Sequence, residues 1–366
     1  MIKLALTGDV MLGRGIDQIL PSPGNPRLYE DYLKSAQDYV HLAERANGPI
    51  PRDAGPGYVW GDAPDALRQE KAGVTIVNLE TAVADTGTAE PKGINYRMNP
   101  ANAGVLQHLP ADCCVLANNH VLDWGEEGLL QTLDTLQGLR IPFAGVGRDA
   151  TQAAAPAVLR GPGGRVLVFA FAARDSGVPR RWAAGSNTPG VNRLDRLDAA
   201  RVDAIAAQVA AVKAAGDIAI ASIHWGGNWG YEIPAQHMSF AHALVDRAGI
   251  DVLHGHSSHH AKGFEIRHGK LILYGCGDFL NDYEGIRGYE EFRADLALIY
   301  LPVLDETAGG ILVSLRIVPF QIRKFRLNRA CAADASWLAE TLTRHCLSPG
   351  MRLVMEPDAT LRLQAG

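Results

Sequence analysis

The sequence predicts an α/β fold in which mixed β-sheets are covered by helices and form one domain over residues 1–366. Short apolar runs without charges alternate with helix-length amphipathic segments over most of the chain. A hairpin-like pair of apolar runs and a last helix follow this alternating part. Apolar residues make up 47% of the chain and charged residues 20%, which indicates a globular protein with a sizeable core.

In the amino-terminal half, the predicted strands are followed by polar loops. The expected strands cover residues 3–6, 74–77, 92–98 and 113–116, and the expected helices cover 62–69, 100–109 and 126–137. Gly138 ends the last of these helices, whose leucines recur at helical spacing. Residues 21–61 combine Pro-rich arms with a helix-like segment at 29–47, so we expect an insertion that forms a lid or rim over a pocket.

The carboxyl-terminal half continues the alternation and then changes character. The expected strands cover residues 141–147, 165–172, 217–223, 250–253 and 270–274, and the expected helices cover 195–215, 234–248 and 334–345. Apolar runs at 294–303 and 310–319 flank a polar, Gly-containing turn and predict an antiparallel hairpin. The hairpin and the last helix form an expected extension over residues 294–350.

Composition narrows the classes of function. The net charge of −5 and the pI near 6.2 do not support nucleic-acid binding, which requires a basic surface. The sequence begins directly with a short strand and contains no apolar run long enough for a membrane span, so we expect a soluble, cytoplasmic protein without a secretory signal. The five cysteines show no zinc-type spacing and are expected to be reduced.

A histidine cluster follows the predicted strand at 250–253. His254, His256, His259 and His260 place four of the twelve histidines within seven residues. Imidazoles this close repel one another when protonated, and metal ions are their natural partner. Loops at the carboxyl ends of strands are also where α/β folds collect ligands. The alternative is a surface cluster that only titrates with pH.

Other predicted strands end in residues of the same chemistry: Asp9, Glu80, Asn119 with His120, and His224. Carboxylate and imidazole ligands together suit Mn²⁺, Fe²⁺ or Zn²⁺ better than Ca²⁺. The number of candidate ligands exceeds one tetrahedral site, so we expect two divalent metal ions that share a carboxylate. For Asp9 alone, the N-cap of a helix is an equal alternative.

The ordered motifs resemble one known family. They are GD at 8–9, NLE at 78–80, ANNH at 117–120, HWG at 224–226, GHSSH at 255–259 and GCGDF at 275–279. This order resembles the CapA family of poly-γ-glutamate capsule-synthesis (PGA_cap) proteins, which belong with the calcineurin-like metallophosphoesterases. The resemblance implies a four-layer α-β-β-α sandwich that binds two metals.

The resemblance also implies roles for individual residues. Asp9 would match the first aspartate of the superfamily, and Glu80 would replace its bridging aspartate. The other ligands would be Asn119, His224 and His256 on the second metal and His259 on the first. His120 would be the proton donor that binds no metal.

Two departures from the superfamily pattern bear on function. Met11 stands where the superfamily has a ligand histidine, so the first metal would be weakly held or completed by His254, His260 or Asp278. The GHSSH motif is also one residue longer than the superfamily's GHxH. The chain shows no membrane anchor of the kind expected of capsule-assembly members. It looks like a soluble relative, a group that includes an epimerase of lasso-peptide precursors.

The resemblance favours a metal-dependent enzyme that acts on a peptide or polyamide. The sharpest form of this expectation is inversion of a Cα in a lasso-type precursor peptide, with a leader-peptide-binding protein as a partner. A metal next to a carbonyl stabilises an enolate, and His120 is the first candidate acid/base. Its partner would be Asp278, Glu232 or His260, and the expected substrate contacts are Arg97, Trp225, Trp229 and Tyr231. The alternatives are a dinuclear phosphoesterase, a poly-γ-glutamate biosynthesis factor and a binding module stabilised by metal. For Asp278, an equal alternative is that it orients a ligand histidine. For the aromatic residues, the alternative is ordinary packing in the core.

Overall fold

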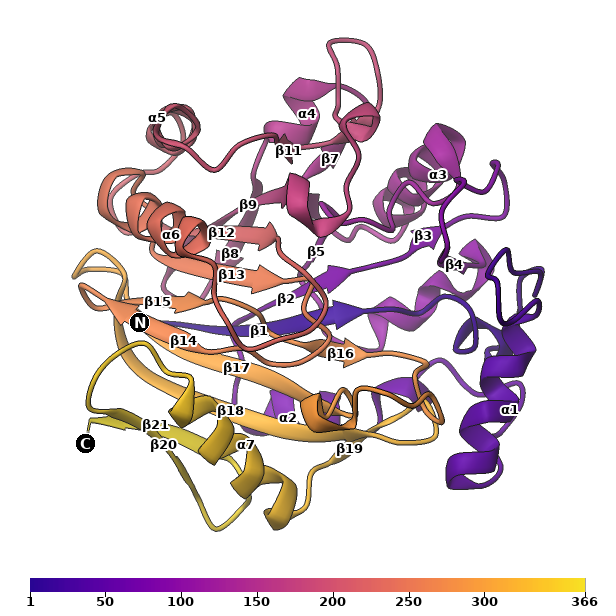
Figure 1. The fold of residues 1–366 in the computed structure, drawn as a ribbon. Coiled ribbons are helices and arrows are strands. Elements are labelled where there is room, and N and C mark those ends of the chain that lie inside the picture. Colours follow the sequence, from indigo (N-terminus) through magenta and orange to yellow (C-terminus); the bar gives the residue numbers. More distant parts are fainter. Residues whose placement is uncertain (366) are drawn as a thin grey trace.

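A computed structural model describes residues 1–365 and contains two large mixed β-sheets (Figure 1). In the ten-stranded sheet, a parallel half contains β1 (Ile2–Val10), β2 (Val74–Leu79), β5 (Cys113–Val115), β6 (Phe143–Ala144) and β16 (Asp278–Leu280). Its antiparallel half contains β17 (Leu296–Asp305), β18 (Ile311–Ile322), β19 (Leu327–Arg329), β20 (Met351–Met355) and β21 (Leu361–Ala365). The hairpin predicted near the end of the chain is therefore β17 and β18.

The seven-stranded sheet is built around four parallel strands: β9 (Gly164–Ala173), β12 (Ile218–His224), β13 (Val252–His256) and β15 (Lys270–Leu273). The short β11 (Arg193–Leu194) extends it in parallel, while β8 (Ala157–Gly161) and β14 (Phe264–Arg267) pair antiparallel. Two small sheets pair β3 (Ala82–Val83) with β4 (Arg97–Met98) and β7 (Val146–Gly147) with β10 (Gly190–Val191).

The alternation along β9 shows how the layers are arranged. Val166 and Val168 are buried in the large core that also contains residues of β1, whereas Leu167 and Phe169 belong to a second core. Successive side chains of a strand point to opposite faces, so the two cores lie on opposite sides of this sheet. The second core is closed by α5 (Ala199–Ala210) and α6 (Ala235–Arg247), which cover the sheet's outer face (Figure 1).

The ten-stranded sheet carries the helices of the other outer layer. α2 (Ala63–Gln69), α3 (Gly125–Gly138), α7 (Ala332–Arg344) and the 3₁₀ helix η3 (Pro100–Gln107) contribute buried apolar residues to the large core. The layers are thus helix, sheet, sheet and helix, which confirms the predicted fold class. α1 (Ala36–Asn47) and the short α4 (Ala150–Ala154) lie beside these layers (Figure 1).

Several predicted elements differ from the observed ones. β1 continues to Val10, so Asp9 lies inside a strand and the helix expected after it is reduced to a 3₁₀ turn, η1 (Asp17–Ile19). Residues 92–98 form a strand only in β4, and η3 replaces the α-helix expected at 100–109. Gly145 divides the strand expected at 141–147, because it has a φ of 91° and a Cβ there would lie 2.6 Å from that of Ala117. Among residues 1–365, no helix is long and apolar enough to cross a membrane.

Candidate metal centre

Strand register brings the predicted ligands together. His224 and His256 are register partners on the neighbouring parallel strands β12 and β13, so their side chains share one face. Asp9 is the partner of Asp278 between β1 and β16 in the other sheet. The carboxyl ends of β1, β2, β12 and β13 point the same way (Figure 1). The polar ends of both sheets therefore meet at one edge of the sandwich.

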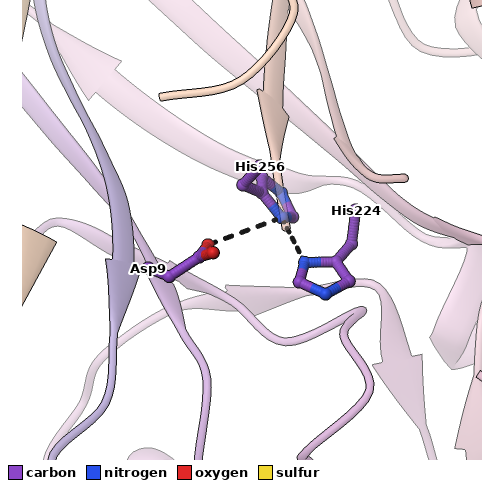
Figure 2. Close-up of side chains that lie close together, drawn as sticks. All are labelled: Asp9, His224 and His256. Carbon is purple, nitrogen blue, oxygen red and sulfur yellow. Dashed lines mark hydrogen bonds and ion pairs between the residues drawn. The ribbon is translucent and has the colours of Figure 1, made fainter. Parts of the chain in front are cut away.

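One group of possible ligands contains Asp9, His224 and His256, whose ligand atoms lie within 4.8 Å of one another (Figure 2). His224 Nδ1 lies 2.8 Å from His256 Nδ1, and His256 Nδ1 lies 4.0 Å from Asp9 Oδ1. Asn119 Oδ1 lies 3.0 Å from His224 Nε2, on the other side of that ring. All three residues of the group are buried, so their ligand atoms are shielded from water.

A second group contains Asp9, His259 and Asp278, again within 4.8 Å. His259 Nδ1 lies 2.9 Å from Asp278 Oδ1. Asp9 belongs to both groups, which is the arrangement that two metal ions sharing one carboxylate require. Asp278 supplies a carboxylate to the group that lacks a histidine at Met11. Asp278 thus lies where a ligand would be needed, although we expected it first as an acid/base.

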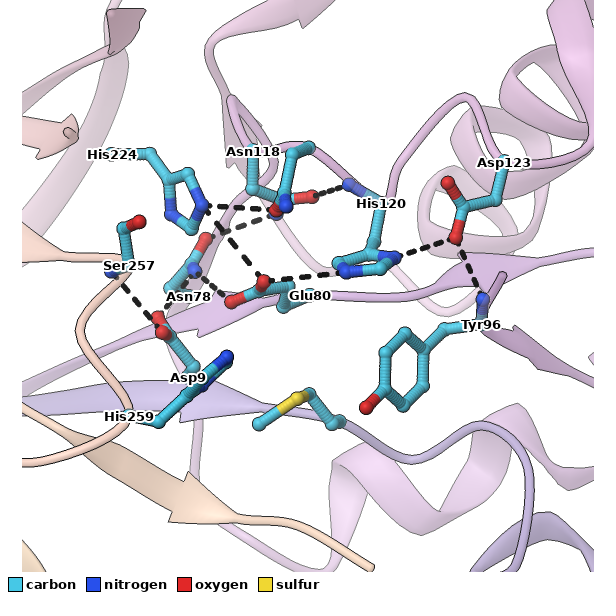
Figure 3. Close-up of polar contacts among 12 residues, drawn as sticks. Asp9, Asn78, Glu80, Tyr96, Asn118, His120, Asp123, His224, Ser257 and His259 are labelled. Atoms are coloured by element: carbon cyan, nitrogen blue, oxygen red, sulfur yellow. Dashed lines mark hydrogen bonds and ion pairs between the residues drawn. The ribbon is translucent and has the colours of Figure 1, made fainter. Parts of the chain in front are cut away.

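Glu80 lies between the metal-type groups and His120. Its Oε1 is 3.8 Å from His224 Nε2 and 3.8 Å from His120 Nε2, and its other oxygen accepts a 3.4 Å hydrogen bond from Asn78. Asn78 also donates to Asp9 Oδ1 over 2.7 Å, so one amide holds both carboxylates (Figure 3). The sequence analysis missed Asn78, although it stands in the same motif as Glu80.

The charges of the site fit divalent cations. Burial, followed by the negative charge of Asp278, raises the pKa of Asp9 from 3.8 to about 7. Burial and the charge of Asp9 raise the pKa of Glu80 well above its ordinary value. Burial also lowers the pKa values of His224 and His256, so both rings are neutral, which is the protonation state in which an imidazole can bind a metal. Packed carboxylates that resist ionisation beside neutral imidazoles are the donor set that Mn²⁺, Fe²⁺ or Zn²⁺ would stabilise.

His120 is held outside both groups. Its Nδ1 lies 2.6 Å from Asp123 Oδ2, an oxygen that also accepts a 2.7 Å hydrogen bond from the backbone N–H of Tyr96 (Figure 3). Lys92 forms an ion pair with the other oxygen of Asp123 and donates to the carbonyl of Asn119. Burial lowers the pKa of His120 to about 4. The imidazole is thus neutral, fixed by Asp123 and turned with Nε2 toward Glu80.

A cavity of about 630 Å³ opens onto the site. Asn119, His120 and His259 lie on its wall at the metal-type groups. The other lining residues come from several further segments of the chain: Arg14, Tyr32, Asn47, Ile94, Tyr96, Asn228, Trp229, Asn281, Tyr283, Tyr289, Glu290 and residues 284–286, 293–295 and 321–323. Trp229 therefore lies where a substrate contact was predicted. Tyr96 was missed because it stands in a loop that the sequence analysis assigned to a strand.

Trp225 is a core residue and not a wall of the cavity. Its ring stacks on His237 with centroids 4.6 Å apart, and its Nε1 donates to the Tyr274 carbonyl over 2.9 Å. As the residue after His224, it points to the opposite face, into the core beneath α5 and α6. The structure therefore places Trp225 away from the cavity wall on which the substrate contact was predicted.

Four further candidates lie outside the cavity lining. Glu232 is exposed, and Tyr231 stacks on His345 with centroids 4.2 Å apart. The Arg97 guanidinium packs 3.6 Å from the ring centroid of Trp124. His260 is packed against aromatic rings, including that of Phe292 at 4.7 Å. The structure does not bring these side chains to His120.

His254 belongs to neither ligand group, and its hydrogen bonds give it a different role. Its Nε2 lies 2.7 Å from the Thr7 carbonyl of the other sheet, and its Nδ1 lies 3.1 Å from Ser222 Oγ. Ser222 Oγ in turn lies 2.9 Å from His256 Nε2. His254 therefore joins the two sheets and, through Ser222, orients a candidate ligand.

Comparison with known proteins places this geometry in a family. The family model described as "Bacterial capsule synthesis protein PGA_cap" matches residues 3–283. The chain belongs to the PGA_cap family. It is 47% identical over 367 aligned residues to a probable polyglutamine synthesis accessory protein of Mycobacterium tuberculosis, covering 99% of this chain and 96% of that protein. The capsule biosynthesis protein CapA of Bacillus anthracis is 23% identical, covering 88% and 68%. The PGA biosynthesis protein CapA of Bacillus subtilis is also 23% identical, covering 77% and 64%.

The match to the PGA_cap family covers every residue of the two ligand groups, together with Glu80, Asn119 and His120. The strands β17 to β21 and the helix α7 lie beyond it. Residues 321–323 of this later part still line the cavity. The mycobacterial relative is matched over nearly all of both chains, so it also aligns with this later part.

Proposed function

We propose that this chain is a metal-dependent enzyme that acts on a glutamate polyamide during polymer synthesis. The relatives named for polyglutamine and poly-γ-glutamate synthesis support the class of substrate. The reaction that the site supports best is cleavage of an amide bond. The observation that most supports cleavage is the position of His120. It lies outside both ligand groups, which share Asp9, and is held by Asp123.

The proposed metal ligands are Asp9, His224 and His256 for one ion and Asp9, His259 and Asp278 for the other, with Glu80 and Asn119 completing the set. Divalent ions held there would act as Lewis acids toward a carbonyl oxygen and make a water molecule more acidic. His120 would carry out the proton transfer. Because Asp123 occupies its Nδ1, the neutral ring offers only Nε2, which would take a proton from the attacking water and then give it to the departing amine nitrogen.

The arrangement of acid/base groups favours cleavage over Cα epimerisation. Inversion at a carbon requires two acid/base groups on opposite faces of the substrate, whereas amide cleavage needs one proton donor besides the metals. Of the expected partners of His120, Glu232 and His260 lie outside the cavity lining, and Asp278 is hydrogen-bonded to His259 and Asn281. The relatives' names likewise mention polyglutamine or PGA and not a lasso-peptide precursor or a leader-peptide-binding partner.

The residues that line the cavity offer contacts to a glutamate polymer. Tyr32 and Asn47, from the insertion at residues 21–61, form part of its lining, which supports the proposed rim. Trp229 offers a ring for packing against methylene groups. The exposed Arg323, which also lines the cavity, would pair with a substrate carboxylate.

The test is to incubate the metal-loaded protein in D₂O with γ-linked and α-linked glutamate oligomers, followed by mass spectrometry. Metal-dependent shortening of the oligomers that disappears in His120→Gln, while Tyr300→Phe cleaves normally, is the expected result. Tyr300 is a suitable control because it is buried in β17, outside the cavity lining.

Three other outcomes would each replace the proposal with a named alternative. Deuterium entering a Cα without cleavage would identify an epimerase. Phosphate release from a generic ester with intact oligomers would identify a phosphoesterase. Equal oligomer binding by wild type and His120→Gln, with no turnover in either, would identify a binding module stabilised by metal.

A further inference from the structure

Two phenol groups meet in the cavity wall beside the ligand groups. Tyr96 Oη and Tyr283 Oη are 3.1 Å apart, and both side chains line the cavity together with His120 and His259. The Tyr283 hydroxyl is within 3.5 Å of the Met11 sulfur as its other partner. A thioether is a weak acceptor, so the Tyr283 hydroxyl donates only a weak hydrogen bond to Met11.

Tyr283 is fixed relative to the second ligand group. Its backbone N–H donates to Asn281 Oδ1 over 3.1 Å, and Asn281 Nδ2 donates to Asp278 Oδ2 over 2.8 Å. The ring also meets that of His259 edge to face, with centroids 5.3 Å apart and an interplanar angle of 89°. Two separate contacts thus connect Tyr283 to candidate ligands of the same metal.

Tyr96 is fixed on the opposite side, at the acid/base. Its backbone N–H donates to the Asp123 oxygen that holds His120, and its ring meets the His120 ring edge to face at 4.5 Å (Figure 3). The pair of hydroxyls therefore spans the cavity wall from the proton donor to the metal ligands. The Tyr283 hydroxyl, held by Tyr96, is therefore positioned in advance to act on a group bound beside the pair.

The nearby guanidinium cannot serve as the donor instead. Arg14 is 3% exposed, forms ion pairs with Asp282 and Glu30, and lies with its Cζ 4.3 Å from the centroid of the Tyr96 ring. Its charge is already neutralised by two carboxylates. Arg14 thus supports the Tyr96 ring, and the uncharged Tyr283 hydroxyl is left as the donor facing the cavity.

We propose that Tyr283 is a catalytic residue whose hydroxyl donates a hydrogen bond to the substrate oxygen placed at the metal centre, with Tyr96 as its positioning residue. In the proposed amide cleavage, on which this role in turnover rests, that oxygen is the carbonyl oxygen as it gains negative charge. The ligand class is an oxyanion or a carbonyl that develops into one. The phenol stays protonated throughout and acts only as a donor.

Inorganic phosphate provides a probe that does not depend on the polymer. Calorimetric titration of the metal-loaded wild type with phosphate should show binding at the metal centre. Tyr283→Phe should weaken the Kd about tenfold, the equivalent of one neutral hydrogen bond. The metal content should not change, because the hydrogen-bond partners of the lost hydroxyl within residues 1–365 are Met11 and Tyr96 and not a candidate ligand. Tyr300→Phe, which removes a buried hydroxyl that has no hydrogen-bond partner among residues 1–365, should bind as wild type does.

The phosphate titration distinguishes failure of the Tyr283 donor role from failure of the proposed function. An unchanged phosphate Kd in Tyr283→Phe, with wild-type metal content, would overturn the donor role while leaving the proposed function intact. Failure of phosphate to bind the metal-loaded wild type would overturn both, because the centre would then be closed to substrate oxygens. If oligomer cleavage is observed, Tyr283→Phe should lower kcat about 100-fold with little change in KM. Tyr96→Phe should lower it less, because only the positioning of Tyr283 is lost.

Discussion

Replacing Asp9 by asparagine should stabilise the metal-free protein and abolish its stabilisation by metal. Asp9 is fully buried among Asp278 and Glu80, and its pKa is raised from 3.8 to about 7. A carboxyl whose folded-state pKa is raised favours the fold below its unfolded pKa, and that advantage is lost as pH rises through the folded value. In the absence of metal, the wild-type fold should therefore carry a charge penalty at pH 8 that Asp9→Asn removes.

The size of the effect follows from two opposing contributions. The rise in pKa corresponds to about 4 kcal/mol at pH 8. The amide of asparagine cannot accept from both Asn78 and Ser257, and one buried donor left without an acceptor costs about 1–3 kcal/mol. The expected net gain in the free energy of unfolding is about 1–3 kcal/mol at pH 8. At pH 5 the charge contribution falls to about 2 kcal/mol, so the two contributions nearly cancel.

Urea unfolding at both pH values, with chelator and with Mn²⁺, measures this directly. Asp217→Asn is the matched control, because a hydrogen bond from Arg165 lowers the pKa of Asp217 and its ionised form stabilises the fold. That control should lose stability at both pH values, equally with and without metal. With chelator present at pH 8, Asp9→Asn could instead be destabilised as Asp217→Asn is. That result would refute the reasoning that the buried, ionised Asp9 destabilises the metal-free fold.

Three further predictions concern the ligands and the core. Met11→His should tighten the binding of the metal at Asp278, since an imidazole replaces a thioether beside that group. Chelator competition measures this affinity, and a weaker or unchanged affinity would contradict the prediction. Asp278→Ala and His256→Ala should each lose one metal and keep the other, and elemental analysis showing that either variant keeps both would contradict the two ligand groups. Trp225→Ala should cost about 3–5 kcal/mol of stability in a urea titration. A selective loss of substrate affinity without destabilisation would instead support the wall role rejected above.

The strand ends of the site could be predicted because the signal is local. Each apolar run is followed at once by a polar residue, and parallel strands place such residues at a common edge. This reasoning found Asp9, Glu80, His224 and His256 together. The same period of two could also have excluded Trp225, because the residue after an inward-facing His224 must face the other side.

The position of Asp278 depends on contacts that a local pattern does not contain. β16 is three residues long and lies parallel to β1, which is more than 260 residues earlier in the sequence. Its close approach requires glycine at position 8, where a Cβ would lie 1.6 Å from the Gly277 carbonyl oxygen. The pairing of Tyr96 with Tyr283 has the same origin, since their loops are joined only through tertiary structure.

The number of metal ions bound by each chain tests the dinuclear centre most directly. Elemental analysis of protein loaded with Mn²⁺ and freed of excess metal should give two equivalents in the wild type. Asp9→Asn should give fewer than one, because Asp9 belongs to both ligand groups. One equivalent in the wild type, or two in Asp9→Asn, would contradict a centre in which two metals share Asp9.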